Sequence, residues 1–404
     1  MTTIPQGYKS TELGIIPETW SVKELGQILS IHHGKSQKDV EADDGEYPIM
    51  ATGGLIGRSR SYLYNKPSVL IGRKGTIDKP QFIDTPFWTV DTLFYTSIRP
   101  DYDPFFTYSA CCCIDWESYN EGTCVPSLIS STIEKIKLPI PSDITEQRAI
   151  ATALADVDAL IEAKRALLEK KRAIKQGTMQ ELLTGNRRLP GFPVTPMQHT
   201  EIGDIPEDWE VKTLGRCASI ARGGSPRPIE SYLTTSPEGV NWIKIGDVSP
   251  GAKYIEDTEE KILSSGAKHS RKVKPGDLLL SNSMSYGRPY ILSLEGCIHD
   301  GWLTIADYDD DFYRDYLYYA LGSSIVVIQY EGLAAGTGVK NLNKKIVAGV
   351  QVPCPRDFHE QEAIASALSD MDDELVSLER KIEKLVDLKE GMMQNLLTGR
   401  IRLV

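Results

Sequence analysis

The strongest hydrophobic pattern in the chain lies in its last fifty residues and has the period of a helix. Apolar side chains there advance by alternating steps of four and three residues, which is the a/d spacing of a coiled-coil seam. They are Ile364, Leu368, Met371, Leu375, Leu378, Ile382 and Leu385. Leu388, Met392 and Leu396 extend the pattern with a small slip. We therefore predict a long helix that presents one apolar face to a partner helix.

A second segment with the same pattern occurs earlier in the chain. Its apolar residues at the matching positions are Ile150, Leu154, Val157, Ile161, Leu168 and Ile174. Lys164 and Lys171 interrupt this seam, so we expect Leu160 and Leu167 to share the contact.

Both segments have the features of complete helices. Neither contains proline, Thr145 and Glu146 stand where the first helix begins, and Gly185 and Gly399 stand where the two helices end. Roughly 40 residues at about 1.5 Å each give a rod near 60 Å long. Because the two segments match each other, we expect the helices to pair antiparallel within the chain and to act as a spacer.

The chain contains two internal repeats. Residues 11–36 match residues 200–225 at an offset of 189 (200 − 11), and the helical segment from Ile144 matches the one from Phe358 at an offset of 214 (358 − 144). The difference of 25 residues (214 − 189) is an insertion between these anchors in the second copy. This period is too long for a solenoid and indicates two domain-plus-helix units.

The stretches between the repeats alternate short apolar runs with turn-forming residues, which is typical of strands with helical pieces between them. We predict an α+β fold in which two α/β domains, related by pseudo-twofold symmetry, are separated by two long antiparallel helices that form a coiled coil. The expected bounds are 1–143 for the first domain, 144–186 for the first helix, 187–199 for an extended, exposed Pro-rich linker, 200–357 for the second domain and 358–404 for the second helix.

Composition agrees with ordinary globular domains, since 41% of the residues are hydrophobic and 25% are charged. No apolar run approaches the roughly 18 residues of a membrane span, and the chain begins without a signal-peptide pattern, so we expect a cytoplasmic protein with no membrane partner. The seven cysteines lack metal-ligand spacing, and we expect buried, reduced thiols.

The loops of both domains carry residue types that recognise DNA. Arginine, lysine, asparagine and serine can bind phosphates or base edges. The candidate DNA-binding residues are Arg58, Arg60, Arg73 and Lys74 in the first domain and Arg222, Arg227, Ser281, Asn282, Ser283, Tyr286, Arg288 and His299 in the second. Lys340, in the loop GTGVKNLNKK, is a candidate phosphate contact. Asp91, Asp300, Trp88 and Trp302 are expected to be structural.

The net charge of −11 opposes DNA binding unless the basic surface is local or is shared with partner subunits.

Short motifs at the ends of the two helices complete the pattern. They are Glu146-Gln147, Ala149-Ile150-Ala151 and Leu182-Leu183-Thr184-Gly185 in the first helix, and Glu360-Gln361, Ala363-Ile364-Ala365 and Leu396-Leu397-Thr398-Gly399 in the second. With this layout, essentially the whole chain resembles the specificity (S) subunit of type I restriction-modification systems. PSVLIGRKGTI and WTVDTLFY also resemble a common type of target recognition domain.

The resemblance implies a non-catalytic subunit that recognises double-stranded DNA. Each domain would recognise one half of a bipartite, asymmetric site, and the helix pair would set the gap between the halves. The resemblance also implies that two methyltransferase (M) subunits dock on the helices and that restriction (R) subunits join the full complex. The cofactors, S-adenosylmethionine and ATP, then belong to those partners and none belongs to this chain.

Two other functions remain open. An enzyme is disfavoured, because the sequence lacks an Asn-Pro-Pro-aromatic methyltransferase signature, and the segment from His33 to Ser36 lacks the leading glycine of a P-loop, which would stand at Leu29. No nuclease carboxylate cluster or metal-ligand set is apparent in the sequence either. The second alternative is a DNA-independent protein-binding coiled-coil scaffold, which binding to DNA without sequence preference would favour.

Overall fold

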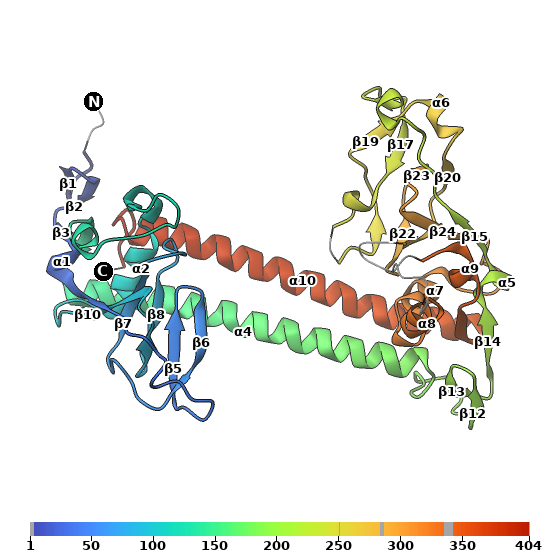
Figure 1. Cartoon of the computed structure of the whole chain (residues 1–404), viewed down its shortest axis with the longest axis horizontal. Coiled ribbons are helices and arrows are strands. Elements are labelled where there is room, and N and C mark those ends of the chain that lie inside the picture. The colour runs from blue at the N-terminus through green and yellow to red at the C-terminus, as the bar shows by residue number, and fades with distance from the viewer. Residues whose placement is uncertain (1–3, 250, 283–286, 335–341, 404) are drawn as a thin grey trace. The chain divides into compact units, whose positions relative to one another are not determined.

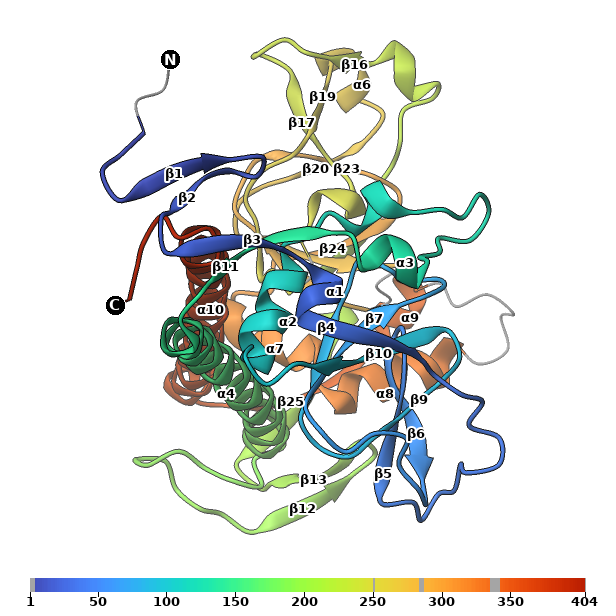
Figure 2. The same cartoon turned by 90° about the vertical axis from the view of Figure 1, so that its left-hand side faces the viewer.

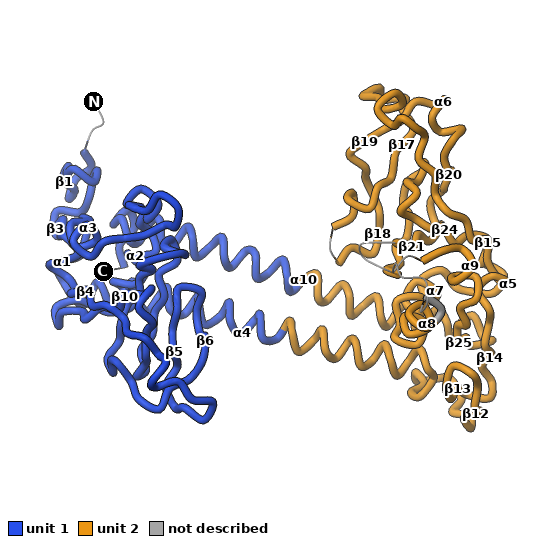
Figure 3. Tube along the Cα trace, viewed as in Figure 1, with its two compact units in different colours: residues 1–167, 378–404 blue, residues 168–377 orange. Residues whose placement is uncertain are grey.

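The computed structural model describes residues 4–249, 251–282, 287–334 and 342–403. The chain forms two compact units (Figure 3). Unit 1 comprises residues 1–167 and 378–404, and unit 2 comprises residues 168–377. Each of the two long helices therefore contributes one part to each unit.

Unit 1 combines sheets with helices (Figures 1 and 2). Its largest sheet has the strand order β4-β10-β7-β8, a second sheet has the order β6-β5-β9, and β1-β2 and β3-β11 form pairs. The strands are β1 Tyr8–Thr11, β2 Gly14–Pro17, β3 Trp20–Glu24, β4 Leu29–His33, β5 Tyr47–Ala51, β6 Gly54–Ser59, β7 Ser68–Gly72, β8 Gln81–Ile83, β9 Trp88–Thr89, β10 Leu93–Ile98 and β11 Lys137–Pro141. The short helices are α1 Leu25–Ile28, α2 Pro104–Cys112, η1 Trp116–Tyr119 and α3 Ser130–Ile133.

Unit 2 is also built from sheets and helices. Two five-stranded sheets have the orders β15-β24-β21-β22-β18 and β16-β19-β17-β23-β20, and β12-β13 and β14-β25 form pairs. The strands are β12 Met197–Thr200, β13 Gly203–Pro206, β14 Trp209–Thr213, β15 Ser219–Arg222, β16 Leu233–Thr234, β17 Val240–Ile243, β18 Tyr254–Ile255, β19 Glu260–Ile262, β20 Arg271–Val273, β21 Leu278–Ser281, β22 Pro289–Leu292, β23 Gly296–Ile298, β24 Trp302–Ala306 and β25 Gln351–Pro355. The short helices are α5 Leu214–Cys217, η2 Ile229–Ser231, η3 Ile245–Asp247, α6 Ser264–Ala267, α7 Arg314–Leu321, α8 Ser324–Ala334 and α9 Lys344–Ala348.

Buried strands form the centre of the large sheet in each unit. β7 and β21 are buried at every position, and both pair with strands on their two sides. Such strands are covered on both faces, which explains their continuous apolar runs. Trp20 and Trp209, at matching positions of the sequence repeat, are almost completely buried in the cores of their respective units.

The two units use the same strand framework. The order β4-β10-β7-β8 in unit 1 corresponds to β15-β24-β21-β22 in unit 2. The registers also agree, because Phe94 pairs with His33 in one sheet and Leu303 pairs with Arg222 in the other. The parallel pairing of β5 with β9 likewise corresponds to that of β17 with β23. The repeat in the sequence is therefore retained in the strand pairing.

The long helices are α4 Ile144–Leu183 and α10 Phe358–Leu396, and in unit 1 the beginning of α4 packs with the end of α10 (Figure 1). Ile150, Leu154 and Leu396 belong to one buried cluster. Asp158 of α4 forms an ion pair with Lys389 of α10 at 2.6 Å. The two helix segments of this unit therefore run antiparallel.

Unit 2 has the complementary arrangement, in which the end of α4 packs with the beginning of α10. Leu182 and Leu368 share the core of this unit. Lys171 of α4 forms an ion pair with Glu374 of α10 at 2.6 Å, and Lys175 of α4 forms one with Asp372 of α10. The helix segments are antiparallel here as well.

Burial follows most of the predicted seam. The buried positions are Ile150, Leu154, Ile161, Leu168, Ile364, Leu368, Leu378 and Ile382, and the half-buried ones are Val157, Met371, Leu375 and Leu385.

The predicted sharing of the seam by Leu160 and Leu167 is wrong, because their exposures are 43% and 37%. Lys164 and Lys171 are the less exposed residues. A lysine stem can cover apolar surface while its ammonium reaches a carboxylate, as Lys171 does with Glu374.

The assignments of Ile174 and Leu388 to the seam are also wrong, because both side chains are exposed. The next residue in each helix, Lys175 and Lys389, turns inward and pairs with an aspartate of the other helix. A lysine therefore lies in the seam near the C-terminal end of each long helix.

The glycines predicted to end the helices are confirmed. Gly185 and Gly399 have φ angles of +73° and +72°, in the left-handed region that favours glycine. An added Cβ would also lie 2.4 Å from Pro206 at Gly185 and 2.5 Å from Pro17 at Gly399. Each helix end thus lies directly against the first strands of a globular domain.

Two predictions of exposure or burial are wrong. The segment after α4 is not exposed throughout, because the Arg188 side chain is buried between the carboxylates of Asp208 and Glu360. The cysteines are free thiols, but Cys113 and Cys124 are exposed, since they lie at the end of α2 and in the loop that follows η1. Within the described parts of the chain, none of the helices has the length and apolar character needed to span a bilayer.

Candidate nucleic-acid interface

In unit 2, several candidate residues gather at the turn between β23 and β24. The main-chain carbonyl of Asp300 accepts hydrogen bonds from Arg222 Nε at 3.0 Å and from Asn282 Nδ2 at 2.8 Å. Arg222 ends β15, Asn282 follows β21, and Asp300 precedes β24. The ends of three strands of one sheet therefore meet at the Asp300 carbonyl.

The carboxylate of Asp300 organises a second set of polar side chains. Its Oδ1 atom lies 3.0 Å from His299 Nε2 and accepts a hydrogen bond from Ser225 Oγ at 3.2 Å, and its Oδ2 atom lies 3.6 Å from Arg227 Nη2. The main-chain N–H of Gly301 donates to His299 Nδ1 at 3.0 Å, which leaves Nε2 as the ring nitrogen that donates to Asp300. The Arg227 side chain remains largely exposed.

A glycine permits the close approach of the strands at this turn. A Cβ on Gly223 would lie 2.0 Å from the carbonyl oxygen of His299. Unit 1 repeats this feature, because a Cβ on Gly34 would lie 2.0 Å from the carbonyl oxygen of Val90. No other residue fits either position without a shift of the backbone.

Unit 1 has a matching polar turn around Asp91. Arg73 Nη1 donates to the main-chain carbonyl of Asp91 at 3.1 Å, as Asn282 does to Asp300. The main-chain N–H of Arg73 donates to the main-chain carbonyl of Thr92 at 2.8 Å, and that of Asn282 donates to the main-chain carbonyl of Gly301 at 3.0 Å. Arg73 and Asn282 therefore occupy the same position on the two frameworks.

The chain returns to this position in the same way in both units. The main-chain N–H of Leu128 donates to the carbonyl of Arg73 at 3.0 Å, and that of Leu342 donates to the carbonyl of Asn282 at 3.0 Å. Lys74, the next residue of unit 1, is exposed and forms a β-bridge with Ser127. The backbone of the site is thus conserved between the units, whereas the side chains that it presents differ.

A cavity adjoins the Asp300 cluster in unit 2. It has a volume of about 840 Å³, and its lining includes Arg227, His299, Leu233, Lys244 and the buried Trp242. His299 contacts the edge of Trp242, with the ring centroids 5.9 Å apart. The combination of a cation, an imidazole and apolar walls suits contacts to base edges and to methyl groups.

Not every candidate lies at these turns. Arg58 and Arg60 are exposed on and next to β6 in a different sheet, where Arg58 donates to the Glu46 carbonyl at 2.9 Å and Arg60 pairs with Asp44 at 3.0 Å. Arg288 is half-buried with its guanidinium 5.5 Å from the ring centroid of Tyr290.

Two candidates are buried and three are outside the described residues. Ser281 and Asn282 have exposures of 0% and 4%, so their side chains support the turn. Ser283, Tyr286 and Lys340 lie outside the residues that the structure describes. Among the described residues, no group of three or more His, Cys, Asp or Glu side chains is arranged to hold a metal ion.

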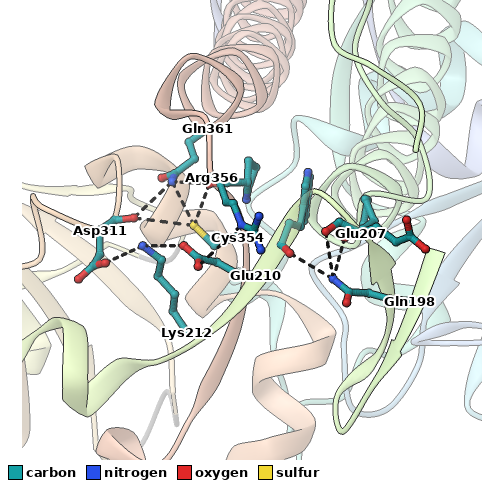
Figure 4. Close-up of polar contacts among 11 residues, drawn as sticks. Gln198, Glu207, Glu210, Lys212, Asp311, Cys354, Arg356 and Gln361 are labelled. Carbon is teal, nitrogen blue, oxygen red and sulfur yellow. Dashed lines mark hydrogen bonds and ion pairs between the residues drawn. The ribbon is translucent and has the colours of Figure 1, made fainter. Parts of the chain in front are cut away.

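The polar contacts at the start of α10 place this helix against the second domain (Figure 4). The Gln361 amide nitrogen donates to the Pro355 carbonyl at 3.0 Å and to the Asp311 carbonyl at 3.3 Å, and it lies 3.0 Å from Cys354 Sγ. Burial raises the pKa of the Cys354 thiol to about 12, so this sulfur stays protonated and unreactive near neutral pH.

Ser225 and the arginines that bind the buried glutamates are not among the residues predicted from sequence. Arg402 binds Glu146 in unit 1 and Arg188 binds Glu360 in unit 2. The repeat contained a signal for both arginines, because they are separated by the same 214 residues (402 − 188) as the helices. Ser225 closes the repeated segment at residues 200–225.

Comparison with known proteins covers almost the whole chain. Residues 17–170 and 206–387 match the family described as Type I restriction modification DNA specificity domain. The Type I restriction enzyme MjaVIII specificity subunit of Methanocaldococcus jannaschii is 26% identical over 430 residues, which cover 96% of this chain and 94% of that protein. The EcoDI specificity subunit of Escherichia coli is 20% identical over 422 residues, with 96% and 89% covered. The crystal structure of the type I S subunit from M. genitalium matches with a TM-score of 0.62 at 17% identity, over 93% of this chain and 96% of that one.

Proposed function

Because the chain belongs to the family of type I restriction modification DNA specificity domains, we propose that it selects the DNA site for a methyltransferase and restriction complex. Each domain recognises one half of a bipartite, asymmetric site in double-stranded DNA. The observation that carries this proposal is the pair of matching turns at Asp91 and Asp300, where one framework carries Arg73 in the first domain and, in the second, the exposed Arg222 beside a buried Asn282. Two half-sites of different sequence require such a difference.

The proposal extends to the individual contacts. Arg73 and Lys74 of the first domain and Arg222, Arg227 and His299 of the second bind DNA. Lys74, Arg222 and Arg227 are exposed, and Arg73 and His299 are half-buried. Their convergence on one turn in each domain supports this assignment. The buried Ser281 and Asn282 orient the turn. Arg58, Arg60 and Arg288, which lie away from these turns, and Ser283, Tyr286 and Lys340, which lie outside the described residues, are further candidate contacts by residue type.

In this proposal α4 and α10 form an antiparallel coiled coil that relates the two halves of the chain by a pseudo-twofold axis and sets the gap between the half-sites. Two sets of ion pairs support this twofold relation. In each set, adding 214 to the number of the basic residue and subtracting 214 from that of the acidic residue gives the second pair, as expected when a twofold axis exchanges the two copies. They are Lys175–Asp372 with Lys389–Asp158, and Arg188–Glu360 with Arg402–Glu146.

Partner subunits then carry out the catalytic reactions. Two M subunits dock on the helix pair and bring S-adenosylmethionine, R subunits bring ATP-driven restriction, and the chain itself is non-catalytic and holds no cofactor. A DNA surface shared with these subunits accounts for the net charge of −11, since a sole DNA binder of this size would need a basic footprint.

Mapping of methylated bases tests the proposal. The chain is mixed with its M subunits, S-adenosylmethionine and DNA of random sequence, and M subunits alone serve as the control. We expect methyl groups within one bipartite sequence, and only when the chain is present. Methylation that requires the chain but shows no sequence preference would instead favour the DNA-independent scaffold.

A further inference from the structure

Unit 2 carries a strand that the corresponding sheet of unit 1 lacks. β18 pairs parallel with β22 at the edge of the five-stranded sheet, whereas the matching sheet in the described part of unit 1 ends at β8. β18 lies between the repeat anchors, where the second copy has its 25 additional residues (214 − 189). Lys253 immediately precedes this strand.

The side chain of Lys253 is largely buried, and its ammonium group is fully paired. Only 13% of the side chain is exposed. Its Nζ atom lies 2.6 Å from Asp315 Oδ1 and donates to Ser369 Oγ at 2.8 Å and to the Tyr319 hydroxyl at 3.5 Å. Three partners match the three N–H donors of an ammonium group. Asp315 and Tyr319 belong to α7 and Ser369 belongs to α10, so one side chain joins the sheet edge to both helices.

Aromatic rings enclose the same ammonium group. The Nζ atom lies 4.9 Å from the ring centroid of Tyr319, 5.3 Å from that of Tyr318 and 5.4 Å from that of Tyr254. Cation–π contacts at these distances are attractive. Because a buried cation is costly unless each donor is satisfied, small displacements of β18 relative to α7 and α10 are strongly opposed.

The contacts continue to the second long helix. The Tyr319 hydroxyl that meets Lys253 donates to Asp372 Oδ2 at 2.7 Å. Asp372 of α10 in turn forms the ion pair with Lys175 of α4. All of these residues belong to unit 2, so the network links the recognition domain to the segments of both helices that lie in the same unit.

Unit 1 fills the corresponding interface with apolar rings. The main-chain N–H groups of Asp103 and Tyr313 donate to Gln147 and Gln361, respectively, at 2.9 and 2.7 Å, which identifies α2 as the counterpart of α7.

By this match, Phe105 of α2 stands at the position of Asp315, and Tyr108 at that of Tyr318. Phe82 of β8 packs on both rings of α2, with centroids 5.2 and 5.6 Å apart. At these matching positions the contacts of unit 1 are between rings, whereas those of the Lys253 network are directional.

We propose that Lys253 is a positioning residue that fixes the orientation of the second recognition domain on the helix segments of unit 2, and so determines the tolerance for the length of the gap between the half-sites. This inference rests on the proposed function. It assigns to the inserted strand β18 a role in measuring DNA that is separate from base recognition.

The test compares Lys253→Met with the wild type in the assembled complex with M subunits. Methionine keeps the length of the lysine stem and removes the charge. Initial methylation rates are measured on DNA with the mapped half-sites and a gap that is correct, one base pair longer or one base pair shorter. We expect the wild type to prefer one gap, and the variant to lose that preference by roughly tenfold, as small misplacements affect rates strongly. The base preferences within each half-site should be unchanged.

Lys212→Met is the matched control. Lys212 is buried to a similar degree, at 16% exposure, and its ion-pair partners Glu210 and Asp311 lie outside the long helices (Figure 4). We expect this variant to lose stability while it keeps the wild-type gap preference. Where Lys253→Met does not unfold cooperatively, Tyr319→Phe replaces it, because it removes only the hydroxyl that bridges Lys253 and Asp372.

Unchanged gap preference in a folded Lys253→Met or Tyr319→Phe variant overturns the inference but leaves the proposed function intact. An equal loss of gap preference in Lys212→Met overturns it as well, because the effect would then follow stability alone. A wild type that methylates DNA without a bipartite sequence preference removes the proposed function and this inference together.

Discussion

Arg402 donates two hydrogen bonds to the carboxylate of Glu146, at 2.6 and 2.7 Å, although 256 residues separate them in the chain. Glu146 is 1% exposed, and Trp20 Nε1 donates to the same carboxylate at 3.1 Å. The segment that follows α10 is therefore tied to the start of α4 and to the first domain within unit 1. The pair Arg188–Glu360 repeats this contact in unit 2.

Replacement of Arg402 by Ala should destabilise unit 1. The substitution leaves the buried Glu146 carboxylate without its cation, and removal of one partner of a buried charged hydrogen bond costs about 1–3 kcal/mol. Urea unfolding measures the change in the free energy of unfolding. Arg400→Ala, an exposed arginine in the same segment, is the control and should change it by less than about 0.5 kcal/mol. Equal losses in the two variants would contradict the role of Arg402.

Arg73→Ala should weaken recognition of one half-site only. An arginine has five N–H donors, and the bond to Asp91 uses Nη1, which leaves donors for a base. Loss of a bidentate contact to guanine reduces discrimination by about 1–3 kcal/mol. Binding is measured on DNA with substitutions in either half-site. Arg99→Ala is the control, since Arg99 also donates to a main-chain carbonyl, that of Gly26 at 2.9 Å, but follows the opposite end of β10. A uniform loss over both half-sites would argue against this assignment.

Gly34→Ala and Gly223→Ala should each damage the polar turn of their own domain. The added Cβ would lie 2.0 Å from a backbone oxygen, so the strand must move, at a cost of about 1–3 kcal/mol or more. Thermal unfolding and half-site binding report the effect. Gly53→Ala, which meets no atom within 4 Å, is the neutral comparison. If Gly223→Ala impaired the first half-site instead of the second, the assignment of domains to half-sites would be wrong.

Asp208 should contribute stability that depends on pH. The hydrogen bond from Arg188 holds the pKa of the Asp208 carboxyl below its ordinary value of 3.8. A group with a lowered pKa stabilises the fold above its unfolded value, and this stability disappears as the pH falls through the folded value. Asp208→Asn should therefore unfold more easily than the wild type near neutral pH, and the difference should shrink as the pH falls below 3.8. The exposed control Glu238→Gln should unfold with nearly the same free energy as the wild type at every pH. A difference between Asp208→Asn and the wild type that does not change with pH would refute the proposed coupling of Asp208 protonation to stability.

Lengthening both long helices should lengthen the gap between the half-sites. Insertion of seven residues in each of α4 and α10 keeps the a/d register, and adds about 10 Å at 1.5 Å per residue. That length corresponds to about three base pairs at 3.4 Å each. Methylation mapping should show the same half-sites with a longer gap. An unchanged gap after the heptad insertion would defeat the spacer proposal.

Periodic and local features of this protein could be predicted from its sequence. The heptad spacing from Ile364 to Leu385 reports which face of a helix is apolar, because side chains three and four positions apart share a face. The glycines at positions 185 and 399 were predicted as helix ends for an equally local reason, since glycine best adopts a positive φ angle. The two internal repeats predicted that one framework occurs twice.

Contacts between distant segments were decided by the tertiary structure alone. A heptad pattern does not identify the carboxylates that lie opposite a seam lysine. Only the packed helices show that Lys171 pairs with Glu374 and Lys389 with Asp158. Arg58 and Arg73 are similar in sequence context, yet the pairing of strands separated by many residues puts Arg58 in one sheet and Arg73 directly after a strand of another. Strand order arises from long-range pairing, which local propensity does not encode. The sequence therefore determined the repeated architecture, and the packing of distant strands determined which polar side chains meet at Asp91 and Asp300.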